Sequence, residues 1–291
     1  MNTPTSCPPP HPHPRVPRLR PPSGAIDAHC HVFGPGHLFP YAEGRTFTPP
    51  DVSEDDLRRR HDHLGLDRAL IVQSSCHGTD HSALLDALRT GGGRYRGVAL
   101  VTPGTPPEEI ARLHEAGVRG ARLNFMPHLG QSPSPETIRA VTDLVGPFSW
   151  HLGVHVAGTG IADLEDVIRA IEIPVVIDHM ARVDLRDGLA SEPVRALKRL
   201  LGEGGVWVKL SGADRLTHEG PPYGDSAALA RALAAHAPER VVWGTDFPHP
   251  NIRGAAPDDG LLVDLLDEIA PSEELRRRIL VDTPAALFGF G

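Results

Sequence analysis

Short apolar segments alternate with longer amphipathic ones from residue 25 to the end of the chain. Eight of the short segments read as strands: 25–33, 68–75, 95–102, 118–125, 151–158, 174–180, 206–212 and 240–246. Each except the first is preceded by a helix-like stretch, and such alternation is typical of a mostly parallel sheet. Eight strand–helix units over about 260 residues predict an α/β fold, a (β/α)8 barrel rather than an open doubly wound sheet.

Local signals mark the ends of several predicted helices. Four hydroxyl side chains precede amphipathic stretches whose first turns carry acidic residues, and they predict helix starts: Ser53, Thr105, Ser134 and Ser272. Three glycines follow such stretches and predict helix ends: Gly65, Gly117 and Gly146.

The first 24 residues differ from the rest of the chain. They are rich in proline and have almost no apolar pattern, so we expect an arm that is disordered or laid along the surface. Residues 25–291 then form the barrel domain.

Composition narrows the class of protein. The 291 residues carry a formal net charge of -8 without a basic block, which argues against a nucleic-acid partner. No apolar run is long enough for a membrane span and no leader pattern is present, so we expect a cytoplasmic protein without a membrane partner. The three cysteines have no CxxC spacing, which excludes a disulfide framework and a thiolate zinc site. A homo-oligomer is compatible with the sequence.

Active sites of such barrels lie at the carboxyl ends of the strands, and ionisable side chains gather there in this sequence. His29 and His31 share one face of the first strand, because side chains alternate along a strand. The fifth strand ends with His155, the sixth with His179 and the eighth with Asp246. No glycine-rich phosphate-binding motif follows any strand.

Three segments, DAHCHVFGP from Asp27, VIDHMARVD from Val176 and WGTDFPHPN from Trp243, together resemble the amidohydrolase superfamily. The resemblance is to its amidohydrolase-2 branch, which includes 2-pyrone-4,6-dicarboxylate lactonase and sulfomuconolactone hydrolases. It implies a distorted (β/α)8 barrel and hydrolytic chemistry. Asp246 would act as the base that activates water, and His29, His31 and His179 would complete the catalytic site.

The resemblance also raises the question of a metal ion. Relatives with one ion bind it through residues that correspond to His29, His31, His155 and Asp246, and nitrogen and oxygen ligands suit zinc or manganese. The alternative is a metal-independent mechanism in which His155 hydrogen-bonds the substrate. The sequence leaves both alternatives open.

Arginines that bind a carboxylate or sulfonate predict the substrate class. Arg122 and Arg215 lie where the resemblance favours binding of a small anionic lactone from aromatic or sugar-acid breakdown. Arg182 either assists them or forms a surface salt bridge. His128 stands where the pyrone lactonase is expected to have an arginine, and Phe47 where a tyrosine is expected. Four further candidates for substrate contact lie in loops after the strands or at the barrel mouth: Ser75, Tyr41, His249 and Asn251.

The sequence therefore predicts a lactone hydrolase that uses water activated by Asp246. One alternative is a metal-dependent decarboxylase of an unsaturated acid on the same barrel, and a second is a non-catalytic barrel that binds a metabolite. Six other histidines fall in or beside predicted helices and are interpreted as surface or capping residues: His61, His63, His81, His114, His218 and His236. Cys30 and Cys76 are expected to be buried thiols.

Overall fold

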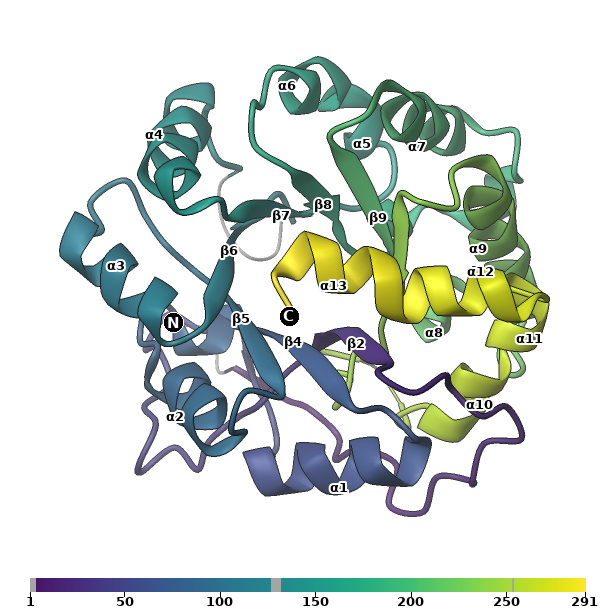
Figure 1. The fold of residues 1–291 in the computed structure, drawn as a ribbon, viewed down its shortest axis with the longest axis horizontal. Helices are drawn as coiled ribbons and strands as arrows, with labels where there is room; N and C mark the ends of the chain where they lie inside the picture. Colours follow the sequence, from purple (N-terminus) through teal and green to yellow (C-terminus); the bar gives the residue numbers. More distant parts are fainter. Residues whose placement is uncertain (1–3, 127–131, 253) are drawn as a thin grey trace.

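The computed structural model describes residues 4–126, 132–252 and 254–291. Its centre is a parallel sheet of eight strands in the order β2-β4-β5-β6-β7-β8-β9-β10, which curves into a ring (Figure 1). The strands are β2 (Ile26–Cys30), β4 (Arg68–Val72), β5 (Tyr95–Ala99), β6 (Val118–Asn124), β7 (His151–His155), β8 (Val175–Ile177), β9 (Val206–Leu210) and β10 (Val241–Trp243). The predicted (β/α)8 barrel is confirmed.

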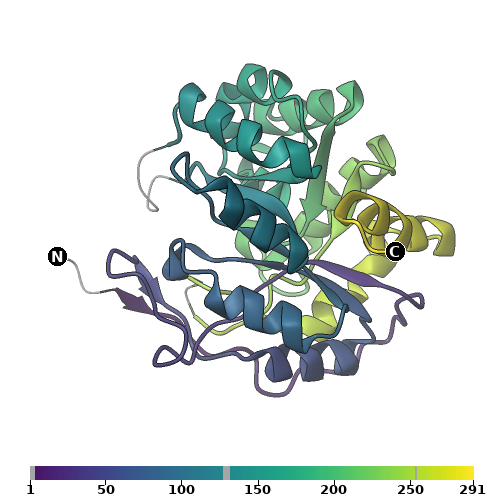
Figure 2. The ribbon, with the colours of Figure 1, turned by 60° about the vertical axis from the view of Figure 1, so that its left-hand side comes forward.

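Helices surround the ring of strands (Figures 1 and 2). The α-helices are α1 (Glu54–Leu64), α2 (Ser82–Thr90), α3 (Pro107–Glu115), α4 (Pro135–Val145), α5 (Gly160–Asp163), α6 (Glu165–Arg169), α7 (Glu192–Glu203), α8 (Ala213–Leu216), α9 (Gly224–His236), α10 (Asp259–Asp264), α11 (Leu266–Ile269), α12 (Glu273–Arg277) and α13 (Thr283–Phe288). Shorter turns are η1 (Ser75–His77), η3 (Gly146–Phe148), η4 (Asp178–Arg182), η5 (Leu185–Asp187) and the π-turn η6 (Arg278–Asp282).

Most of the predicted helix starts are confirmed. Ser53 and Ser134 accept hydrogen bonds from the backbone three residues later at the starts of α1 and α4, and Ser272 does the same at α12. Thr105 was predicted to start a helix, but its hydroxyl instead accepts a bond from the Thr102 amide, and the cap of α3 is Pro106. The prediction failed there because proline at the cap position already fixes the turn into the helix.

The seam of the barrel lies between the two terminal strands of the sheet, β2 and β10. No ladder of paired residues joins these strands in the described part of the chain. Loop bonds close the gap instead, because the Asp246 amide donates to the His29 carbonyl at 2.8 Å and the His31 amide donates to the Phe247 carbonyl at 2.8 Å. The carboxyl ends of β2 and β10 are thereby held together.

The opposite end of the barrel is sealed by the C-terminal segment, whose helix crosses the ring in Figure 1. Phe288 and Phe290 pack against inward-facing residues of the strands, among them Ile26, Leu70 and Val242. Burial of such large apolar side chains is worth about 1.5–3 kcal/mol each. These apolar side chains fill this end of the barrel, so a polar site is expected at the carboxyl ends of the strands.

Residues 4–24 lie along the surface of the barrel beside α1 (Figure 2). This is one of the two arrangements expected for the N-terminal arm. The carboxylate of Asp264 accepts bonds from the amides of Arg18 and Leu19 at 2.7 and 3.1 Å. Near its start, the arm forms β1 (Thr5–Ser6), which pairs with β3 (Phe47–Thr48). Proline has no backbone N–H group, so the proline-rich arm cannot form a regular helix or sheet by itself. Its contacts with the barrel therefore fix its position. Among the described residues, no helix combines the length and the apolar character of a membrane span.

Candidate active site

A pocket opens at the carboxyl ends of the strands. Its lining is rich in charged and imidazole side chains: His31, Phe47, Ser74, Ser75, Arg122, His155, His179, Arg182, Arg215, Asp246, Pro250 and Asn251. Residues more than two hundred positions apart meet here, as the sequence predicted.

Asp246 is the central carboxylate of this pocket. Its Oδ2 accepts a bond from Arg215 Nε at 2.5 Å. Its Oδ1 faces three imidazole nitrogens, the Nε2 atoms of His31 at 3.3 Å, His29 at 3.7 Å and His179 at 3.8 Å. Burial alone would raise the pKa of Asp246, but the charge of Arg215 and the neighbouring imidazoles hold this pKa well below its usual value. The carboxylate is therefore ionised at neutral pH and can accept a proton.

The backbone explains how Asp246 reaches this place. β10 ends at Trp243, and Asp246 has a φ of +67°, in the left-handed region that side chains other than glycine rarely adopt. Such a conformation costs about 1–3 kcal/mol and persists only where the surroundings hold it. Strain of this kind is characteristic of functional positions.

The hydrogen bonds of His31 define which ring nitrogen carries the proton and which carries the lone pair. Nδ1 lies 2.6 Å from the Val72 carbonyl, which can only accept, so Nδ1 carries a proton. In the neutral ring Nε2 is then an acceptor, and it faces Asp246 Oδ1, which is also an acceptor. A proton or a cation between the two atoms would satisfy both.

His29 is completely buried, and its Nε2 has no hydrogen-bond partner among the described residues. Burial and the charge of Lys209 lower the pKa of His29 to about 3, so the ring is neutral. Lys209 Nζ lies 3.0 Å from Nδ1 and can only donate, so in the tautomer that accepts this bond the ring proton is on Nε2, directed toward Asp246. If Nε2 bound a cation, the proton would move to Nδ1, where Asp178 Oδ1 lies 3.2 Å away.

These residues fit a divalent metal ion. Ligand atoms of His29, His179 and Asp246 all lie within 4.8 Å of one another, and His31 Nε2 adjoins the same carboxylate oxygen. The unpartnered nitrogen of His29 and the two facing acceptors of His31 and Asp246 supply what an ion would need. The donor set of imidazoles and one carboxylate suits zinc or manganese.

The predicted metal set is only partly brought together. His155 lies outside the group of ligand atoms formed by His29, His179 and Asp246. Its Nδ1 lies 3.0 Å from Asn124 Oδ1, and its ring centre is 5.8 Å from that of His179. His155 instead lines the pocket.

A buried ion network behind the histidines was not predicted from the sequence. Asp178 Oδ2 accepts a bond from Arg122 Nε at 2.8 Å, and Asp178 Oδ1 lies 3.1 Å from Lys209 Nζ. Burial would raise the pKa of Asp178, but Lys209 and Arg122 hold this pKa well below its usual value. A lysine inside the apolar strand segment VWVKL was the available signal, because a buried ammonium needs an anionic partner.

The three arginines of the pocket differ in their pairing. Arg122 and Arg215 are engaged by Asp178 and Asp246. Arg182 lines the pocket, yet its guanidinium forms no hydrogen bond or ion pair with any residue in the described ranges. It ends a run of four residues, 179–182, with φ between +46° and +54°, a left-handed turn that carries both His179 and Arg182 to the pocket.

The remaining predicted contacts divide into three groups. Ser75 and Asn251 line the pocket. Tyr41 and His249 do not, because the Tyr41 hydroxyl donates to Asp51 at 3.3 Å, and the buried His249 lies 2.8 Å from Asp259 Oδ1. His128 lies outside the described residues.

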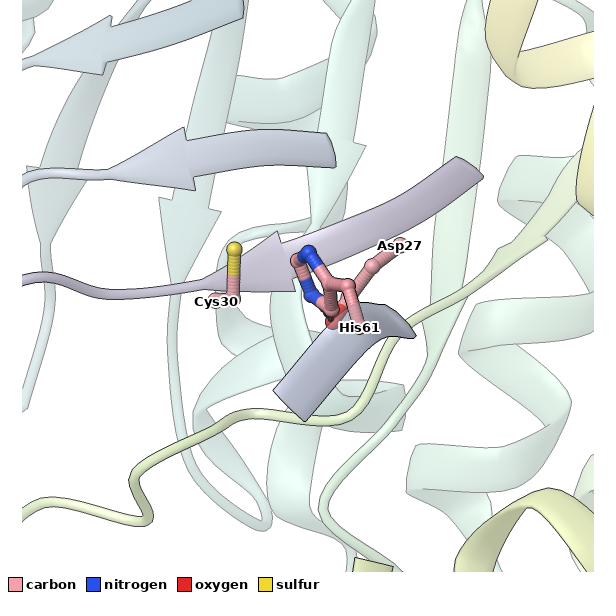
Figure 3. Close-up of side chains that lie close together, drawn as sticks. All are labelled: Asp27, Cys30 and His61. Carbon is pink, nitrogen blue, oxygen red and sulfur yellow. Dashed lines mark hydrogen bonds and ion pairs between the residues drawn. The ribbon is translucent and has the colours of Figure 1, made fainter. Parts of the chain in front are cut away.

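A second cluster lies beside the active site. Asp27 and Cys30 from β2 and His61 from α1 are completely buried and lie close together (Figure 3). The interpretation of His61 as a surface or capping residue was wrong, because its Nε2 is 3.1 Å from Asp27 Oδ2. His81 occupies the N-cap position of α2, in agreement with the capping interpretation, but its side chain is buried, with Nε2 2.9 Å from the Leu100 carbonyl. In both residues a buried oxygen atom accepts a hydrogen bond from the imidazole, and this bond replaces the one that water would provide. Cys30 and Cys76 are buried thiols, as expected.

Comparison with known proteins identifies the family. The sequence profile of the amidohydrolase family matches residues 26–290. A 2-pyrone-4,6-dicarboxylate hydrolase of Comamonas testosteroni is 40% identical over 285 residues, which cover 95% of this chain and 93% of the relative. A 4-sulfomuconolactone hydrolase of Rhizobium radiobacter is 38% identical over 271 residues, 92% of this chain and 91% of that protein. A crystal structure from Agrobacterium tumefaciens, in its apo form, is 31% identical with a TM-score of 0.85, and covers 94% of this chain and 99% of its own. The chain therefore belongs to the amidohydrolase family.

Proposed function

We propose that this protein is a hydrolase that opens a small anionic lactone with water activated by Asp246. The observation that carries the proposal is the position of this ionised carboxylate, which is surrounded by three imidazoles at the floor of a pocket lined by three arginines. The relatives named as hydrolases of pyrone dicarboxylate and sulfomuconolactone act on small anionic lactones, and their similarity supports the same substrate class here.

The reaction begins with a water molecule beside Asp246. The carboxylate accepts one proton from this water as the water oxygen forms a bond to the lactone carbonyl carbon. The carbonyl oxygen becomes an oxyanion, which the positive charges of the site stabilise. In the site without an ion, the Nε2–H of His29 would also donate to it, and one well-placed donor is worth about 3–4 kcal/mol. The ring carbon–oxygen bond then breaks, and the proton held by Asp246 passes to the leaving alkoxide.

A divalent ion, zinc or manganese, would be held by His29, His31, His179 and Asp246. When bound, it would supply Lewis acidity toward the lactone carbonyl and lower the pKa of a neighbouring water. All other roles in the reaction belong to residues of this chain. Asp246 carries the proton, Lys209 and Asp178 orient His29, and Val72 orients His31 through its carbonyl.

The acid group of the substrate would bind to the arginines. Arg182 supports this assignment most directly. Its guanidinium lies at the wall of the pocket without a hydrogen bond or ion pair to the described residues, so it is available to a carboxylate or sulfonate. Arg122 and Arg215 present their remaining N–H groups to the same space. His155, Ser75 and Asn251 complete the contacts with the substrate.

The proposal is tested by incubating the purified protein with 2-pyrone-4,6-dicarboxylate, 4-sulfomuconolactone and a sugar-acid lactone. Hydrolysis releases one acid equivalent per turnover and adds the mass of water to the product. Loss of the mass of carbon dioxide would establish the decarboxylase alternative. Binding of the lactones without turnover would support the non-catalytic alternative.

The same assay decides the role of the ion. The protein is analysed for metal content and then assayed before and after dialysis against a chelator. Loss of activity that zinc or manganese restores would support the catalytic ion. Full activity in metal-free protein would reject the ion and leave hydrolysis by Asp246 in place.

A further inference from the structure

We propose that Asp27 and His61 are positioning residues for the catalytic carboxylate. His61 holds the Asp27 side chain, Asp27 holds the backbone on both sides of the barrel seam, and Asp246 is thereby kept against the imidazoles. The inference rests on the proposed function, because that function gives Asp246 its role as the base.

The Asp27 carboxylate has four donors and is completely buried. Its Oδ1 accepts bonds from the amides of His29 and Thr245, both at 3.0 Å. Its Oδ2 accepts a bond from the Thr245 hydroxyl at 2.5 Å and lies 3.1 Å from His61 Nε2. One carboxylate therefore joins the end of β2, the segment after β10 and the helix α1.

Asp27 makes this connection at the seam of the barrel, between β2 and β10. The sheet ends at β2 and β10, so the seam depends on bonds such as that from the Asp246 amide to the His29 carbonyl. The backbones are in close contact there, since a Cβ at Gly244 would lie 2.5 Å from the His29 amide nitrogen and 2.9 Å from Asp27 Oδ1. Asp246, with its φ of +67°, follows Thr245 directly. Its strained conformation requires fixed neighbours, and Asp27 fixes the nearest one.

His61 contacts Asp27 from helix α1, outside the pocket. A carboxylate only accepts hydrogen bonds, so His61 Nε2 is the donor. The other ring nitrogen, Nδ1, is buried and has no hydrogen-bond partner among the described residues. A buried imidazole with one unsatisfied nitrogen is costly, and among the residues that the structure describes Asp27 is the one hydrogen-bond partner of this ring. His61 is thus suited to orient Asp27 rather than to fill space.

A metal site at the same three residues is the competing interpretation, because the ligand atoms of Asp27, Cys30 and His61 lie within 4.8 Å of one another (Figure 3). Two observations favour the positioning role. The oxygens of Asp27 already accept bonds from four donors, and the Cys30 thiol is directed at a backbone carbonyl of β4. Cys30 Sγ lies 3.7 Å from this carbonyl, that of Leu70.

Three variants test the proposal in the full-length protein. His61→Leu removes the donor and keeps an apolar side chain of moderate size, His61→Gln keeps an N–H at a similar reach, and Cys30→Ala is the matched control from the same cluster. We expect His61→Leu to lower kcat on the hydrolysed lactone by about 10- to 100-fold, because small displacements of catalytic groups have effects of this size, while KM stays within about twofold. We expect His61→Gln to recover most of kcat and Cys30→Ala to keep it within about twofold.

Several results would overturn the proposal. They are an unchanged kcat in folded His61→Leu, an equal loss in the leucine and glutamine variants, and loss of one bound metal ion in both His61→Leu and Cys30→Ala. If His61→Leu does not fold, Thr245→Val and Thr245→Ser make the same comparison from the other side of Asp27, and equal kcat values in this pair would contradict the role. A parent protein that hydrolyses none of the lactones contradicts the proposed function, and with it the positioning role, whereas an active parent with unaffected variants contradicts the positioning role alone.

Discussion

Arg182 provides the clearest prediction about substrate binding. It lines the pocket without an ion pair to any residue that the structure describes, so its replacement breaks no ion pair within that part of the chain. Arg122 and Arg215 lack this advantage, because they are paired with Asp178 and Asp246. A hydrogen bond to a charged group contributes about 1.5–3 kcal/mol. Since 1.4 kcal/mol corresponds to a factor of ten, we expect Arg182→Gln to lower kcat/KM by about 10- to 150-fold.

The assay measures initial rates on the anionic lactone and on an uncharged lactone with the same ring. The loss should appear mainly in KM, with kcat within about threefold of the parent, since the arginine binds the substrate and the transition state alike. The uncharged lactone should be unaffected. Arg186→Gln is the matched control, because this arginine lies in the following turn, pairs with Asp184 and has a side chain that is 72% exposed. An unchanged KM for the anionic lactone, or an equal loss with the uncharged one, would refute the reasoning.

Three further predictions follow from other contacts. If the protein binds one metal ion, His179→Ala should lose it and His155→Ala should retain it in elemental analysis; the reverse would restore the ligand set predicted from the sequence. Burial lowers the pKa of His249, but Asp259 reverses this effect and raises the pKa above its usual value, so the pair stabilises the fold below about pH 6.5 and loses this contribution as the pH rises through the raised pKa. His249→Gln removes this contribution while Arg60 still pairs with Asp259, so it should lower the free energy of unfolding by about 1.5–3 kcal/mol at pH 6, and by less at pH 9, in denaturant titrations. Asp264→Ala leaves two arm amides without their acceptor and should lower this free energy by about 1–3 kcal/mol, with faster proteolysis of the arm and unchanged kcat.

The barrel and the convergence of ionisable side chains at its carboxyl end could be predicted from simple periodicities, whereas the catalytic roles of these side chains were expected from the family resemblance. Strands alternate with helices, and side chains alternate along a strand, so His29 and His31 had to share one face. Positions at the ends of strands then predicted that His179 and Asp246 would meet them, and the structure brings all four together.

The residues that were missed owe their positions to tertiary contacts without a local signature. His61 lies in a helix segment rich in charged residues, EDDLRRRHDHL, and its burial depends on Asp27, which is 34 positions away. The role of His249 depends in the same way on Asp259, a partner that the motif WGTDFPHPN does not contain. The left-handed turn that ends at Arg182 contains no glycine, the residue that would have predicted it from the sequence. Lys209 alone offered a signal, as a charged residue within an apolar strand.

The central claim is that Asp246 is the base that activates water. Asp246→Asn keeps the size of the side chain and can still contact Arg215, but it cannot accept the proton. The decisive measurement is kcat of this variant on the lactone that the parent hydrolyses, beside the surface control Asp86→Asn, and with circular dichroism to verify the fold. We expect the loss of a general base to lower kcat by about 10²- to 10⁴-fold and the control to match the parent. A folded Asp246→Asn protein that hydrolyses the lactone at the rate of the parent would contradict the account.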